Sequence, residues 1–215
     1  MKSFLSLRFA IRSVLAMAIA VALTACDNGA SDSASNAATA KGTASAAGFT
    51  GSDITGTGFG KDIELVDQNG TAIQLQQAYR GKVMVIFFGF TQCPDVCPTT
   101  MAELAQVREK LKPEQRDQVQ IIMISVDPQR DTPAVMKQYV SAFDPSFVGL
   151  TGSAEQIAKV AASFKAYYKK VESGQSYTME HSSGLYVLDT EGESRLLIKP
   201  NTAPEAIAAD IQKLL

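Results

Sequence analysis

Two long apolar runs constrain the fold of this chain more than any other feature. Every residue of 83–90 is apolar or glycine, and the run at 120–126 is apolar at all but two positions. Strands with this pattern are covered on both faces, as the parallel strands of α/β proteins are. Between the two runs, from Pro98 onward, apolar residues recur at helical spacing. The sequence therefore predicts a sheet sandwiched between helices.

The remaining elements continue this α/β order and close on an antiparallel pair. Asn69-Gly70 suits a tight turn, so a β-hairpin is predicted at 61–67 and 71–75. A last strand pair is predicted at 185–188 and 196–198. Cap-type residues predict three further helix starts, at Thr132-Pro133, at Ser153 with Gln156 and at Thr202 with Glu205. This order most closely resembles a thioredoxin-like fold, a mixed central sheet flanked by helices, here with an N-terminal β-hairpin.

The first 25 residues carry the pattern of an export signal. Lys2, Arg8 and Arg12 precede an uncharged apolar run at 13–25 that ends in small residues. The run has about 13 residues, whereas a helix needs about 20 to span a bilayer. We therefore expect a signal peptide over 1–25, with an uncleaved membrane helix as the alternative.

Residues 23–26 (Leu-Thr-Ala-Cys) resemble the lipobox of bacterial lipoproteins, in which the cysteine carries the lipid. The resemblance implies lipid attachment at Cys26 and, because Asp27 follows, retention on the periplasmic side of the inner membrane. Residues 27–50 include 18 Ala, Ser, Gly or Thr, a composition typical of a flexible linker. We expect the lipidated cysteine and linker over 26–54 and one folded domain over 55–215.

The charge balance excludes one class of partner. The chain has 20 Lys+Arg against 22 Asp+Glu, a net charge of -2 and no basic run longer than a dipeptide. It therefore lacks the basic surface that nucleic-acid binding requires, and we expect no such partner. Three cysteines and one histidine also restrict cysteine and histidine chemistry to very few combinations.

Cys93 and Cys97 lie where the strand 83–90 leads into a helix, the position of the active residues in thioredoxin-like proteins. On one helical turn the two thiols would face the same side, with Cα atoms about 6 Å apart, within reach of a disulfide. The helix N-terminus is expected to lower the pKa of at least one thiol. A purely structural disulfide is an alternative, although so short a loop stabilises little. The spacing exceeds Cys-x-x-Cys by one residue, which suits a metal ion as well as a disulfide.

His181 precedes the predicted strand 185–188 and is the single histidine of the chain. A structural hydrogen bond is the ordinary role of such a residue. If the strand after it runs beside 83–90, however, a site with two sulfur ligands and one nitrogen ligand becomes plausible. Thiolates select copper(I) and zinc, and imidazole also accommodates copper(II). Because structural zinc normally takes four protein ligands, copper is the preferred metal for three.

Four stretches of this sequence resemble the Sco/SenC family, thioredoxin-fold copper chaperones of cytochrome c oxidase assembly. They are 89–98 (Gly-Phe-Thr-Gln-Cys-Pro-Asp-Val-Cys-Pro), 124–133 (Ile-Ser-Val-Asp-Pro-Gln-Arg-Asp-Thr-Pro), 149–152 (Gly-Leu-Thr-Gly) and 181–183 (His-Ser-Ser). The resemblance covers roughly 57–200, and the first two motifs are highly specific together. It implies that 55–215 is a copper-binding domain in which Cys93, Cys97 and His181 hold one Cu(I) or Cu(II) ion. Delivery would be to the copper-receiving subunit of the oxidase, at its copper A centre, with a copper-donor protein as a possible further partner.

Four acidic residues could influence this site. The family usually has aspartate before the histidine, whereas this chain has Glu180. Asp95, Asp127 and Asp131 fall inside the matching motifs. For Asp127 and Asp131, flanking a turn and capping the helix from Thr132 is an equally good interpretation.

The same cysteine pair also suits other functions. A thiol-disulfide reductase could use it to keep the cysteines of a copper-receiving protein reduced. A peroxidase starts from the same fold, but the cysteine pattern matches it poorly. The sequence leaves enzyme activity undecided and favours a chaperone over an enzyme.

Overall fold

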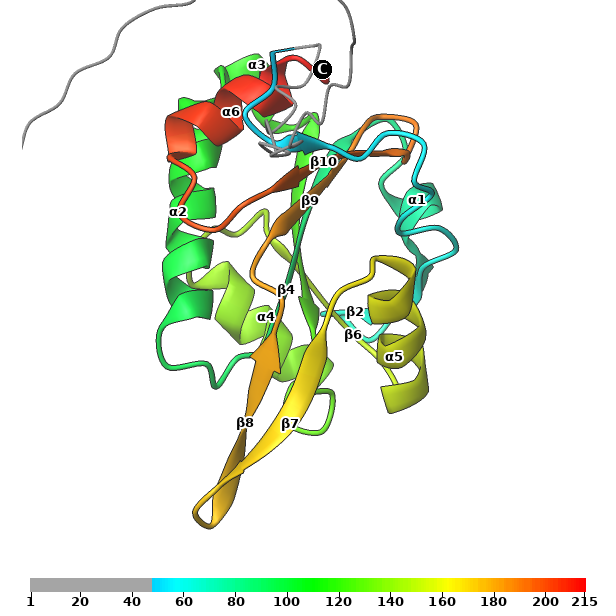
Figure 1. The fold of residues 1–215 in the computed structure, drawn as a ribbon, viewed down its shortest axis with the longest axis vertical. Coiled ribbons are helices and arrows are strands. Elements are labelled where there is room, and N and C mark those ends of the chain that lie inside the picture. Colours follow the sequence, from blue (N-terminus) through cyan, green and yellow to red (C-terminus); the bar gives the residue numbers. More distant parts are fainter. Residues whose placement is uncertain (1–47) are drawn as a thin grey trace, which may run out of the picture. The chain divides into compact units, whose positions relative to one another are not determined.

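A computed structural model describes residues 48–215, which contain an eight-stranded mixed sheet and a separate two-stranded sheet (Figure 1). The main sheet has the order β1-β10-β9-β4-β5-β6-β2-β3. Its strands are β1 (Ser52–Asp53), β2 (Glu64–Asp67), β3 (Ala72–Gln74), β4 (Val83–Gly89), β5 (Val119–Ser125), β6 (Val148–Thr151), β9 (Leu185–Leu188) and β10 (Ser194–Ile198). The smaller sheet consists of β7 (Tyr168–Ser173) and β8 (Ser176–His181).

The predicted signal peptide, Cys26 and most of the predicted linker lie in residues 1–47, outside the described residues. Among the described residues, no helix combines the length and apolar character needed to cross a membrane.

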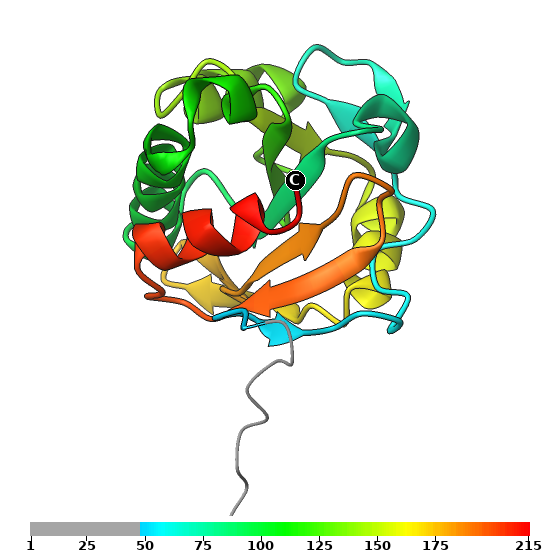
Figure 2. The same cartoon turned by 90° about the horizontal axis from the view of Figure 1, so that it is seen from above.

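Helices lie on both faces of the main sheet, as the apolar runs predict. The helices are α1 (Leu75–Ala78), α2 (Val96–Lys110), α3 (Pro113–Arg116), α4 (Pro133–Ser141), α5 (Ala154–Ser163) and α6 (Pro204–Gln212). Helices α2, α4 and α6 cover one face and α5 covers the other (Figures 1 and 2). At the centre, β4, β5 and β6 run parallel, while β9 runs antiparallel beside β4. This confirms the mixed sheet flanked by helices and places the strand after His181 next to β4.

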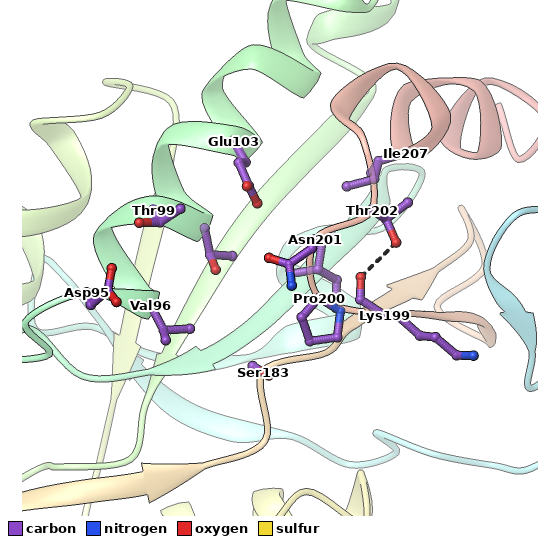
Figure 3. Close-up of a pocket in the computed structure, with 12 residues that line it drawn as sticks. Asp95, Val96, Thr99, Glu103, Ser183, Lys199, Pro200, Asn201, Thr202 and Ile207 are labelled. Carbon is purple, nitrogen blue, oxygen red and sulfur yellow. Dashed lines mark hydrogen bonds between the residues drawn. The ribbon is translucent and has the colours of Figure 1, made fainter.

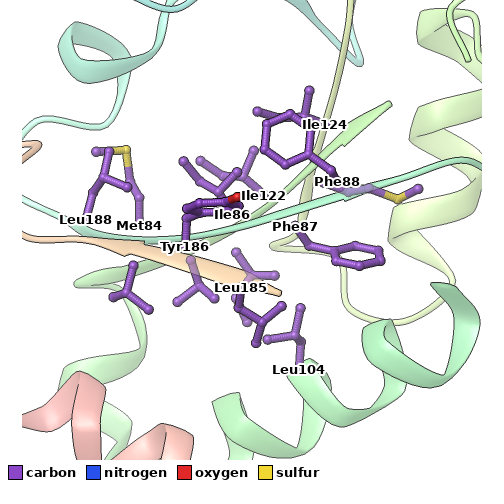
Figure 4. Close-up of a cluster of buried hydrophobic side chains, with 14 of the residues drawn as sticks. Met84, Ile86, Phe87, Phe88, Leu104, Ile122, Ile124, Leu185, Tyr186 and Leu188 are labelled. Atoms are coloured by element: carbon purple, nitrogen blue, oxygen red, sulfur yellow. The ribbon is translucent and has the colours of Figure 1, made fainter. Parts of the chain in front are cut away.

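The core is built on β4, whose seven residues are all buried (Figure 4). Successive side chains of a strand point to opposite faces. Phe88 packs edge-on against Phe164 and Tyr186, with ring centroids 5.4 and 5.9 Å away. Phe87 faces the other way, toward His181, at a centroid distance of 5.9 Å. The strand therefore anchors the core on one face and supports the candidate site on the other.

The N-terminal part of the fold begins earlier than residue 55, the start that the sequence suggested. Strand β1 pairs with β10. The Asp210 side chain, 1% exposed, accepts hydrogen bonds from the backbone amides of Thr50 and Gly51 at 2.8 to 3.0 Å. Local composition could not reveal these contacts, because the two segments lie about 160 residues apart.

Most predicted elements are present, with two differences at helix starts. The 61–75 hairpin forms as β2 and β3, and the caps at Thr132 and Ser153 are confirmed. The capping box at Thr202 and Glu205 is wrong: α6 starts at Pro204, and the Thr202 hydroxyl donates to the Lys199 carbonyl instead. Helix α2 starts at Val96 rather than Pro98, which places Cys97 inside its first turn.

Candidate metal site

Cys93, Cys97 and His181 meet at the end of β4 that leads into α2. Their ligand atoms, two Sγ and one imidazole nitrogen, all lie within 4.8 Å of one another. Both thiols are free, Cys97 is buried, and Cys93 and His181 are partly exposed. The structure thus brings together the three residues that the sequence singled out.

The two cysteines are placed by the strand-to-helix junction. Cys93 lies in the loop after β4, and Cys97 lies in the first turn of α2. The backbone amide of Cys97 donates to the Sγ atom of Cys93 at 3.4 Å. Gly89 at the end of β4 allows this packing, because a Cβ atom there would lie 3.1 Å from the Cys97 sulfur and 2.7 Å from the Phe87 ring.

His181 reaches the cysteines from the last position of β8, held by aromatic edges and one hydrogen bond. The rings of Phe87 and Phe90 lie edge-on to the imidazole, at centroid distances of 5.9 and 5.8 Å. Because a carbonyl can only accept, Nδ1 donates its proton to the Ser182 carbonyl at 2.9 Å. In the neutral ring Nε2 therefore carries the lone pair, which accepts a hydrogen bond from the Cys97 thiol at 3.4 Å.

Burial sets the protonation of both groups at this contact. It raises the pKa of the Cys97 thiol far above its usual value, mainly because the charged form would be desolvated. It also lowers the pKa of His181, so the imidazole is neutral at neutral pH. The lowered pKa expected for at least one of the two thiols does not occur at Cys97, because burial disfavours the charged form of that thiol. A soft cation entering the site would replace the Cys97 proton.

The four acidic residues occupy different surroundings. Asp127 and Asp131 are 3% and 0% exposed, and both carboxylates accept hydrogen bonds from side chains of other segments. Asp95 precedes α2, is exposed and makes no side-chain capping bond. Glu180 is also exposed, and its carboxylate accepts from the Tyr167 hydroxyl at 3.4 Å. None of the four belongs to the cluster of ligand atoms.

Asp131 connects the cysteine loop to the end of β5. Its carboxylate accepts from the Thr91 amide at 3.1 Å, and from the hydroxyls of Thr91 and Ser125 at 2.6 Å each. Thr132, not Asp131, caps α4. Asp131 therefore holds the loop two residues before Cys93 rather than the helix that follows it.

Replacing Asp131 with Ala is expected to lower the free energy of unfolding by about 2 to 4 kcal/mol, because the buried Ser125 hydroxyl and the partly buried hydroxyl and amide of Thr91 lose their acceptor. Urea denaturation of the metal-free protein measures this change. Asp95→Ala is the matched control, since the Asp95 carboxylate is exposed and makes no capping hydrogen bond to α2. This variant should change the free energy of unfolding by less than about 0.5 kcal/mol. Equal stability of the two variants would contradict the role given to Asp131.

Two hollows flank the cluster. One, of about 280 Å³, opens over the ligands and is lined by Phe90, Cys93, Pro94, Asp95, Val96, Thr178, Met179, His181 and Ser183. The other, of about 160 Å³, lies between the first turns of α2 and the segment that joins β10 to α6 (Figure 3). They share Asp95, Val96 and Ser183. The ligand cluster therefore faces an open surface rather than a closed interior.

Several known proteins resemble this chain. A "SCO2-like protein" of Rickettsia felis is 39% identical over 137 residues, covering 62% of this chain and 66% of that protein. The chain thus spans slightly less than two thirds of the length of the first curated relatives it matches. The copper-bound structure of Bradyrhizobium japonicum ScoI is 43% identical, with a TM-score of 0.67, over 73% of this chain and 99% of that one.

Two further solved structures share the fold. A SCO1/SenC family lipoprotein from Bacillus anthracis is 32% identical, with a TM-score of 0.62, over 70% of this chain and 91% of that one. BsSco is described as a member of the Sco family of cytochrome c oxidase assembly proteins with a disulfide switch. It is 27% identical, with a TM-score of 0.60, over 75% of this chain and 95% of that one. These likenesses agree with the thioredoxin-like architecture. A family model described as SCO1/SenC matches residues 52–215, which include both cysteines and the histidine, and the chain therefore belongs to the SCO1/SenC family.

Proposed function

We propose that this protein is a copper chaperone that holds one copper ion through Cys93, Cys97 and His181. The observation that carries the proposal is the convergence of three ligand atoms within 4.8 Å beside an open hollow. Thiolate sulfur and imidazole nitrogen are ligands that copper accepts in both oxidation states. Three ligands with one open side suit an ion that is to be handed on. The copper-bound relative ScoI supports this assignment.

The recipient we propose is the copper-receiving subunit of cytochrome c oxidase, at its copper A centre. Support comes from BsSco, which belongs to a family of cytochrome c oxidase assembly proteins. Copper is the cargo in this reaction, so the ligands must bind tightly yet remain open to the recipient. Cys93 and His181 are partly exposed, so a recipient could reach the ion beside them. Cys97 is buried and would bind the ion from the interior side of the site.

We further propose that the domain acts while tethered to a membrane. In this proposal residues 1–25 direct export, Cys26 carries the lipid, and the linker within 26–54 joins that cysteine to the folded domain. The Bacillus anthracis lipoprotein of the same family supports the lipid anchor. The copper-binding domain would then lie on the periplasmic side of a bacterial inner membrane.

An anaerobic titration of the reduced protein with Cu(I), in competition with a chelator, tests the chaperone proposal. We expect one ion per chain, bound tightly. Because the pKa of the Cys97 thiol is raised, binding must release its proton. Apparent affinity, corrected for the chelator, should therefore rise at least about tenfold per pH unit between about pH 6 and about pH 8. Weak or pH-independent binding would contradict the proposed site.

A second candidate function is that of a thiol-disulfide reductase. The observation in its favour is a partly exposed Cys93 thiol next to a buried Cys97 thiol, both free. Cys93 could attack a partner disulfide, and Cys97 could resolve the mixed disulfide. The Cys97→Ala variant should then accumulate a mixed disulfide through Cys93. A variant that traps no partner would count against this candidate.

A further inference from the structure

The strand that carries His181 lies outside the main sheet. β8 pairs with β7 and with no strand of the eight-stranded sheet in the described part of the chain. Figure 1 shows the β7–β8 hairpin extending beyond the body of the domain. No ladder of backbone hydrogen bonds therefore holds this hairpin against the loop that carries Cys93. The short connection from His181 to β9 and the side-chain contacts of the hairpin therefore set how far His181 reaches toward the cysteines.

One face of β8 is directed toward the site. Side chains alternate along a strand, so Tyr177, Met179 and His181 share a face. Met179 and His181 line the hollow over the ligand cluster together with Cys93. Tyr177 and Met179 line a neighbouring hollow with the turn that follows β5. Contacts made at Tyr177 therefore act on the same face of β8 that carries His181.

Arg130 joins this face to the cysteine loop. Its guanidinium carbon lies 3.8 Å from the centroid of the Tyr177 ring, a close cation–π contact. Nη1 donates to the Tyr177 carbonyl at 3.0 Å and to the Gln92 side chain at 3.2 Å. Gln92 immediately precedes Cys93. A single side chain thus binds both the strand of His181 and the loop of Cys93.

Asp127 completes and orients this set of contacts. Its carboxylate pairs with Nε of Arg130 and accepts from the Tyr177 hydroxyl at 2.9 Å. Asp127 is 3% exposed. The guanidinium of Arg130 therefore contacts the carboxylate of Asp127, the ring and carbonyl of Tyr177 and the side chain of Gln92 at once.

We propose that Arg130 is a positioning residue for the copper site, which holds the His181 strand against the Cys93 loop through Tyr177 and Gln92. It touches no ligand atom itself and acts on copper through His181. This inference rests on the proposed copper function. It assigns a role in metal binding to a residue that the sequence analysis left without one.

The test is a double-mutant cycle on the reduced full chain. The Cu(I) affinities of the native protein, Arg130→Met, His181→Ala and the double variant are compared by chelator competition. Arg130→Met should weaken binding about tenfold when His181 is present and leave affinity unchanged in the His181→Ala background, because coupled residues are not additive. Arg195→Met is the control, since Arg195 makes a similar ion pair with Asp189, at 3.1 Å, and lines neither hollow at the site.

A spectroscopic readout separates positioning from stability. The thiolate-to-copper charge-transfer absorption and the electron paramagnetic resonance spectrum of the Cu(II) form report ligand geometry. Both should change in Arg130→Met and stay native in Arg195→Met, even if the two variants lose similar stability. Tyr177→Phe keeps the ring under the guanidinium, so its spectra should stay closer to native than those of Tyr177→Leu, which removes the ring.

The outcomes distinguish this inference from the proposed function. Equal loss from Arg130→Met in both backgrounds, or native affinity and spectra in that variant, would overturn the positioning role. If the native chain binds no copper tightly, or His181→Ala leaves affinity unchanged, the proposed function itself fails. If circular dichroism shows that Arg130→Met does not fold, Tyr177→Leu takes its place in the same double-mutant cycle. The same affinity and spectroscopic criteria then decide the outcome.

Discussion

Replacing His181 with Ala is expected to weaken Cu(I) binding by at least about a hundredfold. Loss of a residue that only hydrogen-bonds a metal ligand typically weakens binding by about 10- to 100-fold, and loss of a ligand itself should cost more. The imidazole Nε2 carries the ring's lone pair and lies 3.4 Å from the Cys97 sulfur. It is the one nitrogen ligand in the cluster. Without it, two thiolates remain and the third side of the ion is open to solvent. Chelator competition under anaerobic conditions measures the change.

Glu180→Ala is the matched control for this substitution. Glu180 precedes His181 on β8, but its side chain is exposed and accepts only from the Tyr167 hydroxyl. Affinity within about threefold of the native value is expected, since no ligand is lost. A His181→Ala protein that binds copper as tightly as Glu180→Ala would remove histidine from the ligand set. A weakened Glu180→Ala would instead show that this carboxylate supports the site.

Replacing Phe88 with Ala is expected to lower the free energy of unfolding by about 3 to 5 kcal/mol. The side chain is fully buried and packs edge-on against two aromatic rings on the α5 side of the sheet. Its loss removes apolar burial and leaves a cavity in a part of the core that has little room to collapse. Urea denaturation of the metal-free protein measures the change.

The same variant separates the core from the copper site. Because Phe88 and Phe87 point to opposite faces of β4, the folded Phe88→Ala protein should retain its Cu(I) affinity within about threefold. Val96→Ala is the control for stability, since Val96 is 45% exposed and should change unfolding by less than about 0.5 kcal/mol. A loss below about 1 kcal/mol for Phe88→Ala would contradict the core described above.

Most of the main sheet could be predicted from local patterns. The run at 83–90 became β4, and 120–126 became β5, because continuous apolar strands can be satisfied only between two covered faces. The Asn69-Gly70 turn formed as expected, with Gly70 at a φ of 84°. The capping box at Thr202 failed because side-chain capping depends on which residue starts the helix, and Pro204 does so here.

The sequence analysis missed the short elements β1, α1 and α3, the strand β6 and the β7–β8 hairpin, and of these the hairpin carries His181. Many of its side chains are exposed or only partly buried, so no apolar run marks it. Two weak signals were present: Gly174, which takes a φ of 60° at the turn, and the alternation of Tyr177, Met179 and His181. The importance of Arg130 depends on this hairpin and could not be recognised without it.

The sequence by itself determined which residues can bind a soft metal and where the cysteine pair lies, because a spacing of four residues at a strand-to-helix junction is local information. Only the tertiary structure decided two further properties. It brought His181, 84 residues from Cys97, to 3.4 Å from that sulfur, since β9 pairs with β4. It also raised the pKa of Cys97, because desolvation depends on everything packed around a group and not on its neighbours in the chain.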